Sequence, residues 1–457
     1  MASDAREKSS ELVSVSPPPL PLDKRNGQAD SNPKFRVWFA RATICLILAA
    51  LLKFWNTISI SSRIEFSFGK TGPRQGPVRL PPCYDIPDGL TLDSCINWSE
   101  VAWGTERVSG EAITANMSGL EVDSGLFFTA RGYNCIGVIQ FSQPNNGTLH
   151  PGDAEVAIQI EDKPEHRWFI DSIEVCKLSR NDGSHGVGVF LPKLQAPVGS
   201  EAPYMEIEVN LPPPDEDSEV LDVPFLETDM PHFWTILGFD SKERKIRFKD
   251  VRITGDSGMI KSKFVEAENI AINTDFGPVG GHFMAHSSVT IKTELGFVHA
   301  QLDLSNNDPD RATVAKIHST TGYIYPDLDL LSGSGDPSKR KYIVEAKSEN
   351  PDAQVYTSVK DDSEKRATLQ LDVVGGLVET HFSKTFYGSF DVTAVPGSTT
   401  REPSVYRRTW LAENDDLLVT NYSEDRLSVQ GSVSRPGEQV SPSSVKISYS
   451  KWAQLGL

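Results

Sequence analysis

A repeated pattern centred on glycine constrains this sequence more than any other feature. Counting from the glycine, apolar residues recur seven and five positions before it and two and six positions after it. Five segments fit this pattern, and the first three follow one another at intervals of nineteen residues. The fitted positions are Val251, Ile253, Gly258, Ile260 and Phe264; Ile270, Ile272, Gly277, Val279 and Phe283; Val289, Ile291, Gly296, Val298 and Leu302; Ala315, Ile317, Gly322, Ile324 and Leu328; and Leu369, Leu371, Gly376, Val378 and Phe382. Val344, Ala346 and Val355 form a degenerate unit around the turn Asn350-Pro-Asp352.

The pattern predicts two short strands around each glycine turn. One such unit cannot bury its own apolar face, whereas units stacked at a near-constant rise share a continuous core. We therefore expect a β-helix or β-solenoid over residues 241–395, with a stacked pair of long sheets as the alternative. We also expect the glycines to provide a positive φ at the turns, which other residues resist.

Two of these units resemble a known family. Ile270-Ala-Ile-Asn-Thr-Asp-Phe-Gly-Pro-Val279 and Val289-Thr-Ile-Lys-Thr-Glu-Leu-Gly-Phe-Val298 are similar to units of the putative-adhesin repeat family of β-helical proteins. The resemblance covers roughly residues 245–395, although the spacing of 26 residues before Gly322 departs from regularity. It implies a surface-exposed structural or adhesive role, and it provides no catalytic residues to carry over.

The first part of the body shows a different periodicity. Over residues 83–210, short segments such as Glu155–Glu161 alternate apolar and polar residues, and turn signals such as Asn181-Asp-Gly-Ser184 separate them. Alternation is typical of half-buried strands, so we expect an antiparallel, β-sandwich-like unit here.

Two further segments complete the predicted body. Residues 211–240 begin with a triple proline and a run of acids, and we expect an acidic linker with a connecting strand. Residues 396–457 are expected to form a C-terminal β capping segment. The predicted fold class is therefore all-β, an antiparallel unit followed by a solenoid, preceded by one transmembrane helix.

That helix is predicted over residues 37–60. An uncharged core from Ala42 to Leu52 lies between Arg41 and Lys53, and Trp38 and Trp55 flank it. Tryptophan and the charged ends of long side chains favour the two membrane interfaces, so the segment predicts a signal anchor. A cleaved signal peptide is the alternative, because a short apolar core fits that too.

The anchor predicts the topology of the chain. Residues 1–36 are polar and proline-rich and indicate a disordered cytosolic tail, while residues 61–82 indicate a stalk. We expect a cytosolic N-terminus and a lumenal or extracellular body, at the plasma membrane or in the secretory pathway. The layout resembles membrane proteins of filamentous fungi that have a short tail, one anchor and a β-rich ectodomain.

Cysteines and glycosylation sequons fit this topology. Cys83, Cys95, Cys135 and Cys176 lie beyond the span, and an even, clustered set indicates two disulfides in an oxidising compartment. Three connectivities exist, and we favour Cys83 with Cys95 and Cys135 with Cys176 because these pairs close the smaller loops; four free thiols are the alternative. Sequons for N-glycosylation begin at Asn97, Asn116, Asn146 and Asn421.

Composition excludes one class of partner. The chain has 62 Asp and Glu against 45 Lys and Arg, a net charge of −17. An acidic surface repels phosphate backbones, so nucleic acid is not an expected partner. The expected partners are the lipid bilayer, through residues 37–60, and a glycan, a cell-wall component or another protein as ligand.

Catalytic motifs are weakly represented. Gly255-Asp-Ser-Gly258 matches part of a serine-protease signature, but its last glycine already belongs to the repeat. Asp-Ser-Gly occurs at Asp123 and Asp256, as in aspartic proteases, yet without the small hydroxyl residue that should follow. Asn273-Thr-Asp275 and Asp361-Asp362 only superficially match polygalacturonases.

Metal sites are not expected either. His282 and His286 are four residues apart, about 13 Å along a strand, too far to share an ion. Asp327 and Asp329 alternate with leucines, as on the outward face of a strand. We therefore expect no cofactor and a non-enzymatic structural, adhesive or binding role; a carbohydrate-active β-helix enzyme acting on wall polysaccharide is the alternative.

Overall fold

The computed structural model describes residues 87–98, 112–132, 135–144, 152–161, 163, 166–191, 203–214, 218–239, 246–308, 310–331, 339–361, 367–382, 386–395, 401–406, 417–423, 427–434 and 443–457. Contacts divide the chain into two compact units, Met1–Val78 and Arg79–Leu457. The predicted tail, anchor and stalk (1–36, 37–60 and 61–82) lie outside the described residues, as do Cys83 and Asn146. Within the ranges given above, no helix has the length and apolar character needed to cross a membrane.

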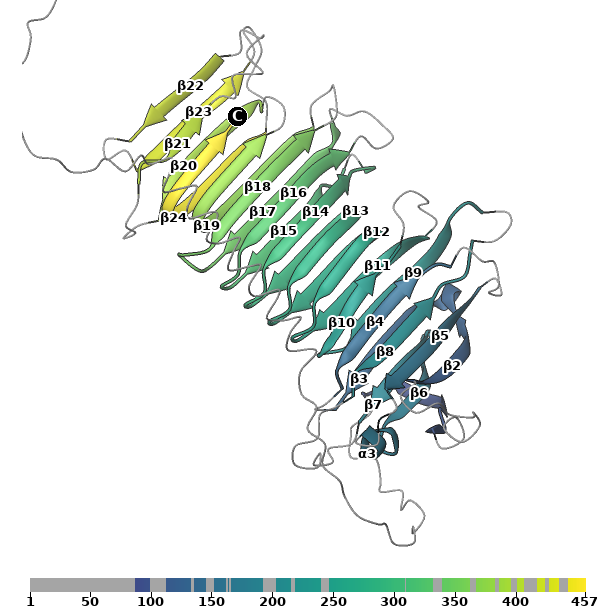
Figure 1. Cartoon of the computed structure of the whole chain (residues 1–457). Coiled ribbons are helices and arrows are strands. Elements are labelled where there is room, and N and C mark those ends of the chain that lie inside the picture. Colours follow the sequence, from purple (N-terminus) through teal and green to yellow (C-terminus); the bar gives the residue numbers. More distant parts are fainter. Residues whose placement is uncertain are drawn as a thin grey trace, which may run out of the picture. The chain divides into compact units, whose positions relative to one another are not determined.

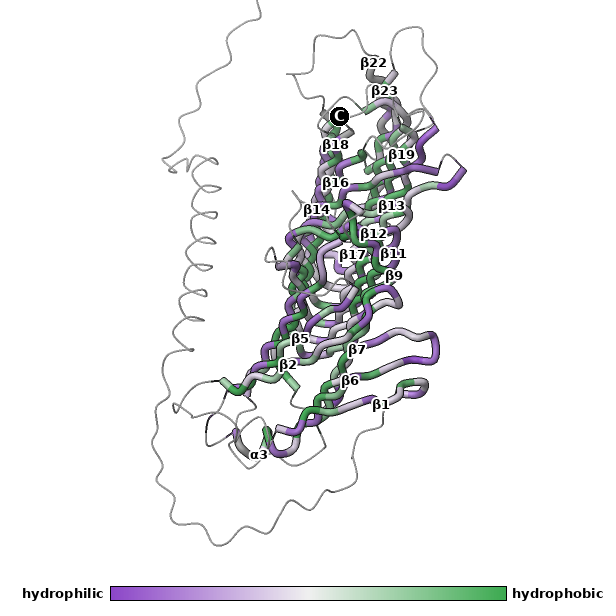
Figure 2. The backbone as a smooth tube through the Cα atoms, turned by 90° about the vertical axis from the view of Figure 1, so that its right-hand side faces the viewer, coloured by the Kyte–Doolittle hydropathy of each residue, from purple (hydrophilic) through white to green (hydrophobic). Residues whose placement is uncertain are grey.

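The unit Arg79–Leu457 is all-β and consists of two stacked sheets facing each other. Most neighbouring strands run parallel, and the chain passes from one sheet to the other and back in successive coils (Figure 1). Figure 2 shows the two layers edge-on, with β14, β16 and β18 in one layer and β9 and β11 in the other. This is the β-solenoid that the repeat predicts.

Sheet 1 contains, in spatial order, β1 (Leu90–Cys95), β6 (Glu174–Arg180), β7 (His185–Phe190), β3 (Leu126–Arg131), β9 (Leu221–Asp229), β11 (Ile246–Gly255), the second halves of β12 (Ile260–Thr274) and β13 (Val279–Thr293), β15 (Thr313–Ser319), β17 (Lys341–Ser348), the first halves of β19 (Thr368–Phe382) and β24 (Ser444–Gly456), β20 (Gly388–Ala394), β23 (Ser428–Ser434) and β22 (Leu417–Tyr422).

Sheet 2 contains β2 (Ala112–Glu121), β5 (Asp153–Glu161), β8 (Met205–Asn210), β4 (Gly137–Ser142), β10 (Phe233–Leu237), the first halves of β12 and β13, β14 (Val298–Ser305), β16 (Ile324–Leu331), β18 (Gln354–Asp361), the second halves of β19 and β24, and β21 (Ser404–Tyr406). The long strands β12, β13, β19 and β24 bend from one sheet into the other and so join them.

All apolar positions of the repeat except Phe264 point between the sheets, and all of them are at least 95% buried. A bulge between Ser262 and Val265 sets Val265 opposite Phe283, so the buried Phe264 ring instead contacts His282, with ring centres 5.0 Å apart. In-register pairing places like residues in columns, for example Ile253 beside Ile272 and Ile272 beside Ile291. One hydrophobic core runs from Trp98 to Leu457 through every coil. The burial of the predicted positions is confirmed.

The prediction that the repeat glycines adopt a positive φ was wrong. None of the five repeat glycines has a positive φ. A Cβ on Gly277 would lie 2.0 Å from the carbonyl oxygen of Gly258, and one on Gly296 would lie 2.2 Å from that of Gly277. Gly322 and Gly376 meet the backbone of the preceding coil in the same way. Glycine is required because successive turns stack in backbone contact.

Buried hydroxyls hold three of these turns in place. Thr274 accepts a hydrogen bond from the N–H of Gly277 (3.0 Å), Thr293 from Gly296 (2.8 Å), and Ser319 from the N–H of residue 322 (2.7 Å). The same hydroxyls donate to carbonyls of the coil below, as Thr274 does to Asp256 (3.2 Å). Polar groups buried at the turns are thereby satisfied.

The segment 83–210 is not a separate sandwich. Antiparallel pairs exist there, β1 with β6, β6 with β7, β2 with β5 and β5 with β8. However, β3 pairs in parallel with β7 and β9, and β4 pairs in parallel with β8 and β10. These strands are the first coils of the same solenoid, and the antiparallel strands close its N-terminal end.

The expected linker and cap also belong to the stack. Within 211–240, β9 and β10 form a complete coil between β3–β4 and β11–β12. Within 396–457, β24 contributes to both sheets, and the antiparallel strands β22 and β23 extend sheet 1 beyond β20. At the opposite end, Trp98 and the short helix α3 (Arg167–Ile170) cover the core.

Candidate binding face

The outward side chains of two neighbouring strands in sheet 2 form the most distinctive surface of the described residues. On β14 and in the turn before it, the outward residues are Phe297, His299, Gln301 and Asp303, of which Asp303 is buried; on β16 and its turn they are Tyr323, Tyr325, Asp327 and Asp329. Parallel pairing sets His299 beside Tyr325, Gln301 beside Asp327 and Asp303 beside Asp329. We call these eight residues the β14–β16 face. It changes from aromatic to acidic along the strands.

An exposed apolar column leads into the aromatic end of this face. Its members, each directly after a turn, are Trp234, Met259, Pro278, Phe297 and Tyr323. The residue following each member donates its N–H to the carbonyl of the next member, at 2.8–3.0 Å. The members are therefore neighbours in consecutive coils, and at about 4.8 Å per coil the column extends roughly 19 Å.

The column is unusually exposed for its composition. Trp234 is 42% exposed, Phe297 52% and Tyr323 50%, and the neighbouring turns add Phe276 at 53% and Leu295 at 51%. Single exposed apolar side chains are ordinary, whereas a contiguous group marks an interaction surface. No inward packing explains why these positions are apolar.

The aromatic rings of the face contact one another. The rings of Tyr323 and Tyr325 are 6.4 Å apart, and those of His299 and Tyr325 are also 6.4 Å apart. The Tyr325 hydroxyl donates to Gln354 Oε1 at 3.3 Å. Partial burial, and then the neighbouring Tyr323, raise the pKa of Tyr325 above its usual 10.0, so its hydroxyl stays a neutral donor.

The acidic end is held by a chain of polar contacts. His282 Nε2 lies 2.8 Å from Asp303 Oδ2, and Gln301 Nε2 contacts Asp303 at 3.5 Å and Asp329 at 3.3 Å. Lys360 Nζ lies 3.2 Å from Asp329 Oδ1. Carboxylates directly opposite on neighbouring strands repel each other, and the Lys360 ammonium offsets this repulsion.

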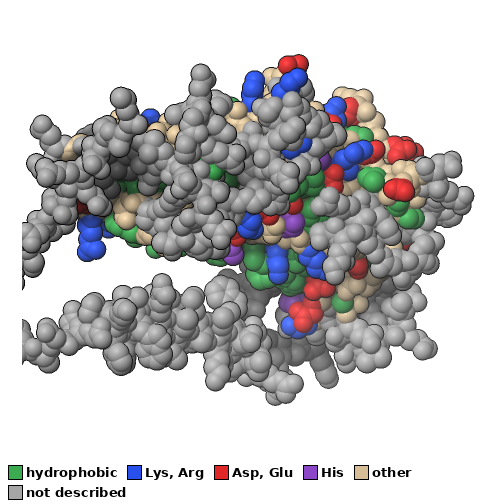
Figure 3. All heavy atoms as spheres, turned by 90° about the horizontal axis from the view of Figure 1, so that it is seen from above, with side chains coloured by type: hydrophobic (Ala, Val, Ile, Leu, Met, Phe, Trp, Pro, Cys, Tyr) green, Lys and Arg blue, Asp and Glu red, His purple; other side chains and the backbone are tan. Residues whose placement is uncertain are grey.

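The neighbouring carboxylates change the pKa of Lys360. The hydrogen bond to Asp329 raises the pKa of Lys360 above its usual 10.5, against a smaller lowering by burial, and the charges of Asp327 and Asp303 add to the increase. On the side of the molecule drawn in Figure 3, basic, acidic and hydrophobic side chains are interspersed, without a large field of one charge.

His282 and His286, which are too far apart along the strand to share a metal ion, each contact a different carboxylate. His282 contacts Asp303, whereas His286 Nε2 lies 3.0 Å from Glu266 Oε1. Across the described residues, no three His, Cys, Asp or Glu side chains are grouped closely enough to hold a metal ion.

In the structure, a histidine lies close to the serine and the aspartate of the Gly255-Asp-Ser-Gly258 motif. His232 Nδ1 lies 3.1 Å from Ser257 Oγ and 3.7 Å from Asp256 Oδ2. A catalytic triad needs the serine and the aspartate on different ring nitrogens, because one nitrogen takes the serine proton while the other is oriented by the carboxylate. Here both partners contact Nδ1, so the three residues do not form a triad.

The other carboxylate pairs are not brought together. Asp123 precedes the start of β3 and Asp256 follows the end of β11, and both strands run parallel to β9. The two carboxylates therefore lie at opposite ends of sheet 1 and cannot share a proton. Asp275 is in a turn before sheet 2 and Asp361 ends β18, so these also lie at opposite ends of sheet 2.

The favoured disulfide pairing was wrong. Cys95 is bonded to Cys176, 81 residues away in sequence, because antiparallel pairing of β1 with β6 sets the two residues opposite each other with Cα atoms 3.9 Å apart. Cys135 is a free thiol in the core, and burial raises its pKa to about 12. Sequence proximity was the wrong criterion, since strand register decides which cysteines meet.

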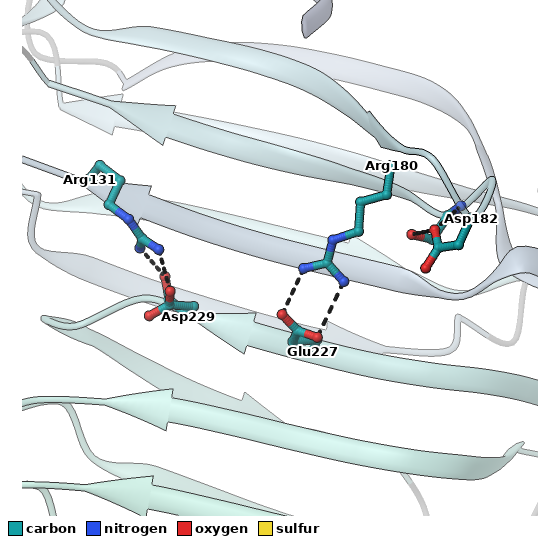
Figure 4. A network of polar contacts seen from close by, with 6 residues as sticks. Arg131, Arg180, Asp182, Glu227 and Asp229 are labelled. Atoms are coloured by element: carbon teal, nitrogen blue, oxygen red, sulfur yellow. Dashed lines mark hydrogen bonds and ion pairs between the residues drawn. The ribbon is translucent and has the colours of Figure 1, made fainter. Parts of the chain in front are cut away.

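A second group of charges lies on the outer side of sheet 1 near its N-terminal end. Arg180 donates to both carboxylate oxygens of Glu227 (2.7 and 3.3 Å), and Arg131 pairs with Asp229 (Figure 4). The Arg180 guanidinium also lies 4.0 Å from the centre of the Phe127 ring, over a small outer cluster of Phe127, Leu178 and Phe190. Each charge has its partner here, which indicates a structural role.

Comparison with known proteins gives little further constraint. No protein-family model matches the chain, and no curated protein matches it. Among solved structures, a putative cell adhesion protein from Clostridium sporogenes matches with 9% identity and a TM-score of 0.14, covering 75% of this chain and 96% of that one. At that TM-score the likeness carries no argument about fold or function.

Proposed function

We propose that this chain is a non-enzymatic, membrane-tethered β-solenoid that binds an extended glycan, such as a wall polysaccharide, on the β14–β16 face. The observation that carries the proposal is the exposed apolar column that continues into hydrogen-bonding side chains on one rigid sheet. A sugar ring has one apolar face and a rim of hydroxyls. Aromatic rings with polar neighbours match both parts, because they provide a flat apolar contact and directed hydrogen bonds.

The periodicity of the solenoid suits a polymer. Tyr323 and Phe297 lie in adjacent coils, and Trp234 continues the same column three coils further on. A chain of sugars lying along the column would meet an equivalent contact in each coil, so weak contacts would add up over its length. The acidic end, with Asp303 and Asp329, disfavours anionic polymers such as nucleic acid.

The tether is part of the proposal. Residues 37–60 would anchor the chain with its N-terminus in the cytosol, and the body would lie in the secretory lumen or outside the cell. The disulfide between Cys95 and Cys176 supports an oxidising compartment. Protease treatment of intact microsomes tests the topology: the body should be protected, and its digestion would reverse the assignment.

Glycan binding is tested with the full chain in mild detergent on an array of wall polysaccharides. The double variant Phe297→Ser/Tyr323→Ser removes two half-exposed rings and should weaken binding at least tenfold, since each ring contributes about 1 kcal/mol. Ile343→Ser, on the outer side of sheet 1 at 36% exposure, is the matched control and should bind as the wild type does. Absence of glycan binding, or equal binding by the double variant, would refute the proposal.

A second candidate is a carbohydrate-active enzyme on the same face. It is favoured by one observation, that Asp303 and Asp329 contact the same Gln301 nitrogen at 3.5 and 3.3 Å and so form a close carboxylate pair. Against it, each carboxylate has its own basic neighbour, as expected of a structural pair. Release of reducing ends from a bound polysaccharide, abolished in Asp303→Asn, would establish the enzyme in place of the binding protein.

A further inference from the structure

The two ends of the solenoid expose strands with one partner each. At the N-terminal end, within the described part of the chain, β1 pairs only with β6 and β2 only with β5. At the C-terminal end, among the described strands, β22 pairs only with β23 and β21 only with β24. Such edges present unpaired backbone groups to any other strand, so native proteins protect them. A stack with two open ends can also grow by adding copies end to end, which produces filaments.

Three of the sequons lie at three of these four edges, and β21 (Ser404–Tyr406) has none. Asn97 lies two residues after β1, Asn116 lies within β2, and Asn421 lies within β22. All three asparagines are exposed. Between Asn146 and Asn421 the sequence has further asparagines but no sequon, so none of the strands from β5 to β21 carries one. The fourth sequon, at Asn146, lies outside the described residues.

The two N-terminal sequons belong to different sheets but meet in one place. Asn97 and Asn116 both line an open depression of about 490 Å³ between β1 and β2, together with Cys95, Met117 and Lys177. Lys177 bridges the two sheets here by donating to the carbonyl of Gly119. Groups attached to both asparagines would cover the N-terminal end of the stack from both sides.

We propose that N-linked oligosaccharides on Asn97, Asn116 and Asn421 cap the ends of the solenoid and prevent end-to-end pairing with a second copy. A glycan is bulky and hydrated, and beside an edge strand it excludes the close approach that backbone pairing needs. The inference requires a lumenal or extracellular body. It does not require that the β14–β16 face binds a ligand.

The test uses the full chain from a eukaryotic secretory host. Glycopeptide mass spectrometry should find Asn97, Asn116 and Asn421 occupied. The wild type in detergent should sediment as one species, whereas Asn97→Gln/Asn116→Gln/Asn421→Gln should associate into concentration-dependent multiples of the monomer mass. Removal of the glycans from the folded wild type by peptide N-glycosidase should produce the same association without a substitution.

A matched control distinguishes the effect of losing the glycan from the effect of losing the asparagine side chain. Ser118→Ala and Ser423→Ala abolish the sequons at Asn116 and Asn421 but keep both asparagines, and they should promote association as the Asn→Gln changes do. Unoccupied asparagines, or glycan removal that leaves a single species, would overturn the inference. Glycan-array binding is measured separately on the same samples, so a failure of ligand binding does not bear on the result.

Discussion

The central coils, β11 to β19, and the N-terminal coils, β3 to β10, build the same two sheets by different means. In the centre, chain order equals spatial order within each sheet, and the repeat glycines stack on the backbone of the coil below, as Gly296 does on Gly277. Near the N-terminus the coil β3–β4 lies between β7–β8 and β9–β10, so chain order and spatial order differ. Parallel stacking therefore does not depend on a repeated sequence.

The N-terminal coils have no repeated sequence, and individual side-chain contacts stabilise them instead. The disulfide fastens the edge strand β1, Arg180 pairs with Glu227 above Phe127, and Asp182 orders the turn between β6 and β7. The centre has one contact repeated many times, whereas the N-terminal coils have several contacts that occur once. A destabilising substitution at a repeat glycine in the centre should therefore act by disturbing backbone stacking. A destabilising substitution in the N-terminal coils should act by removing a specific side-chain contact.

The largest expected effect is at a repeat glycine. Gly296→Ala places a methyl group 2.2 Å from the carbonyl oxygen of Gly277, and neither backbone can yield without displacing a coil. We expect a loss of about 3 kcal/mol in the free energy of unfolding, measured by denaturant titration. Gly280→Ala is the control: its new Cβ has its nearest contact at 3.4 Å, and the change should stay below about 0.5 kcal/mol. Equal effects would mean that backbone stacking does not explain the glycines.

The disulfide should have an effect of comparable size. Cys95 is exposed, so Cys95→Ser removes the bond to Cys176 without opening a cavity, and the free energy of unfolding should fall by about 2–4 kcal/mol because the unfolded chain loses a constraint. Cys135→Ala is the comparison, and non-reducing peptide mapping of that variant should still recover Cys95 joined to Cys176. A peptide that joins Cys135 to Cys176 in the wild type would contradict the observed pairing.

The difference between the two regions also explains what the sequence could predict. The inward positions of the central coils, such as Ile272 and Ile291, recur at a fixed interval, and their burial follows from the pattern. In the N-terminal coils, β5 to β9 separate β4 from its spatial neighbour β10 along the chain, so no interval repeats. Alternation there identifies strands, but it cannot tell which strands pair or in which direction.

The β14–β16 face was harder to predict than the core. Asp327 and Asp329 were correctly assigned to the outward side of a strand, but outward positions carry no periodic constraint. Tyr323 lies next to Phe297 in the column, but this is seen only when the turns of successive coils are aligned. Both residues directly follow a repeat glycine, and that position is not part of the buried pattern. Aligning the residue after each repeat glycine reveals Met259, Pro278, Phe297 and Tyr323 from sequence, but not Trp234, which follows Phe233.

The smallest expected effect is a local one in the N-terminal coils. Asp182 accepts hydrogen bonds from the hydroxyl (2.6 Å) and N–H (3.0 Å) of Ser184, and these bonds lower the pKa of Asp182 below its usual 3.8. A lowered folded-state pKa stabilises the protein above the unfolded value, and this contribution is lost as the pH falls through the folded value. Because the carboxylate is exposed and screened, Asp182→Ala should cost only about 0.5 kcal/mol at neutral pH.

The pH dependence distinguishes this contribution from a general weakening of the turn. Denaturant titrations of wild type and Asp182→Ala should differ at neutral pH and converge at acidic pH, once the pH has fallen below the lowered folded-state pKa and the carboxyl group is protonated in both folded and unfolded chains. Asp182→Asn keeps an acceptor oxygen but no charge, so its difference from the alanine variant should not vary with pH. If the wild type and the alanine variant differed equally at both pH values, the turn would owe its stability to the backbone, as the central coils do, and the contrast between the two regions would be smaller than the structure indicates.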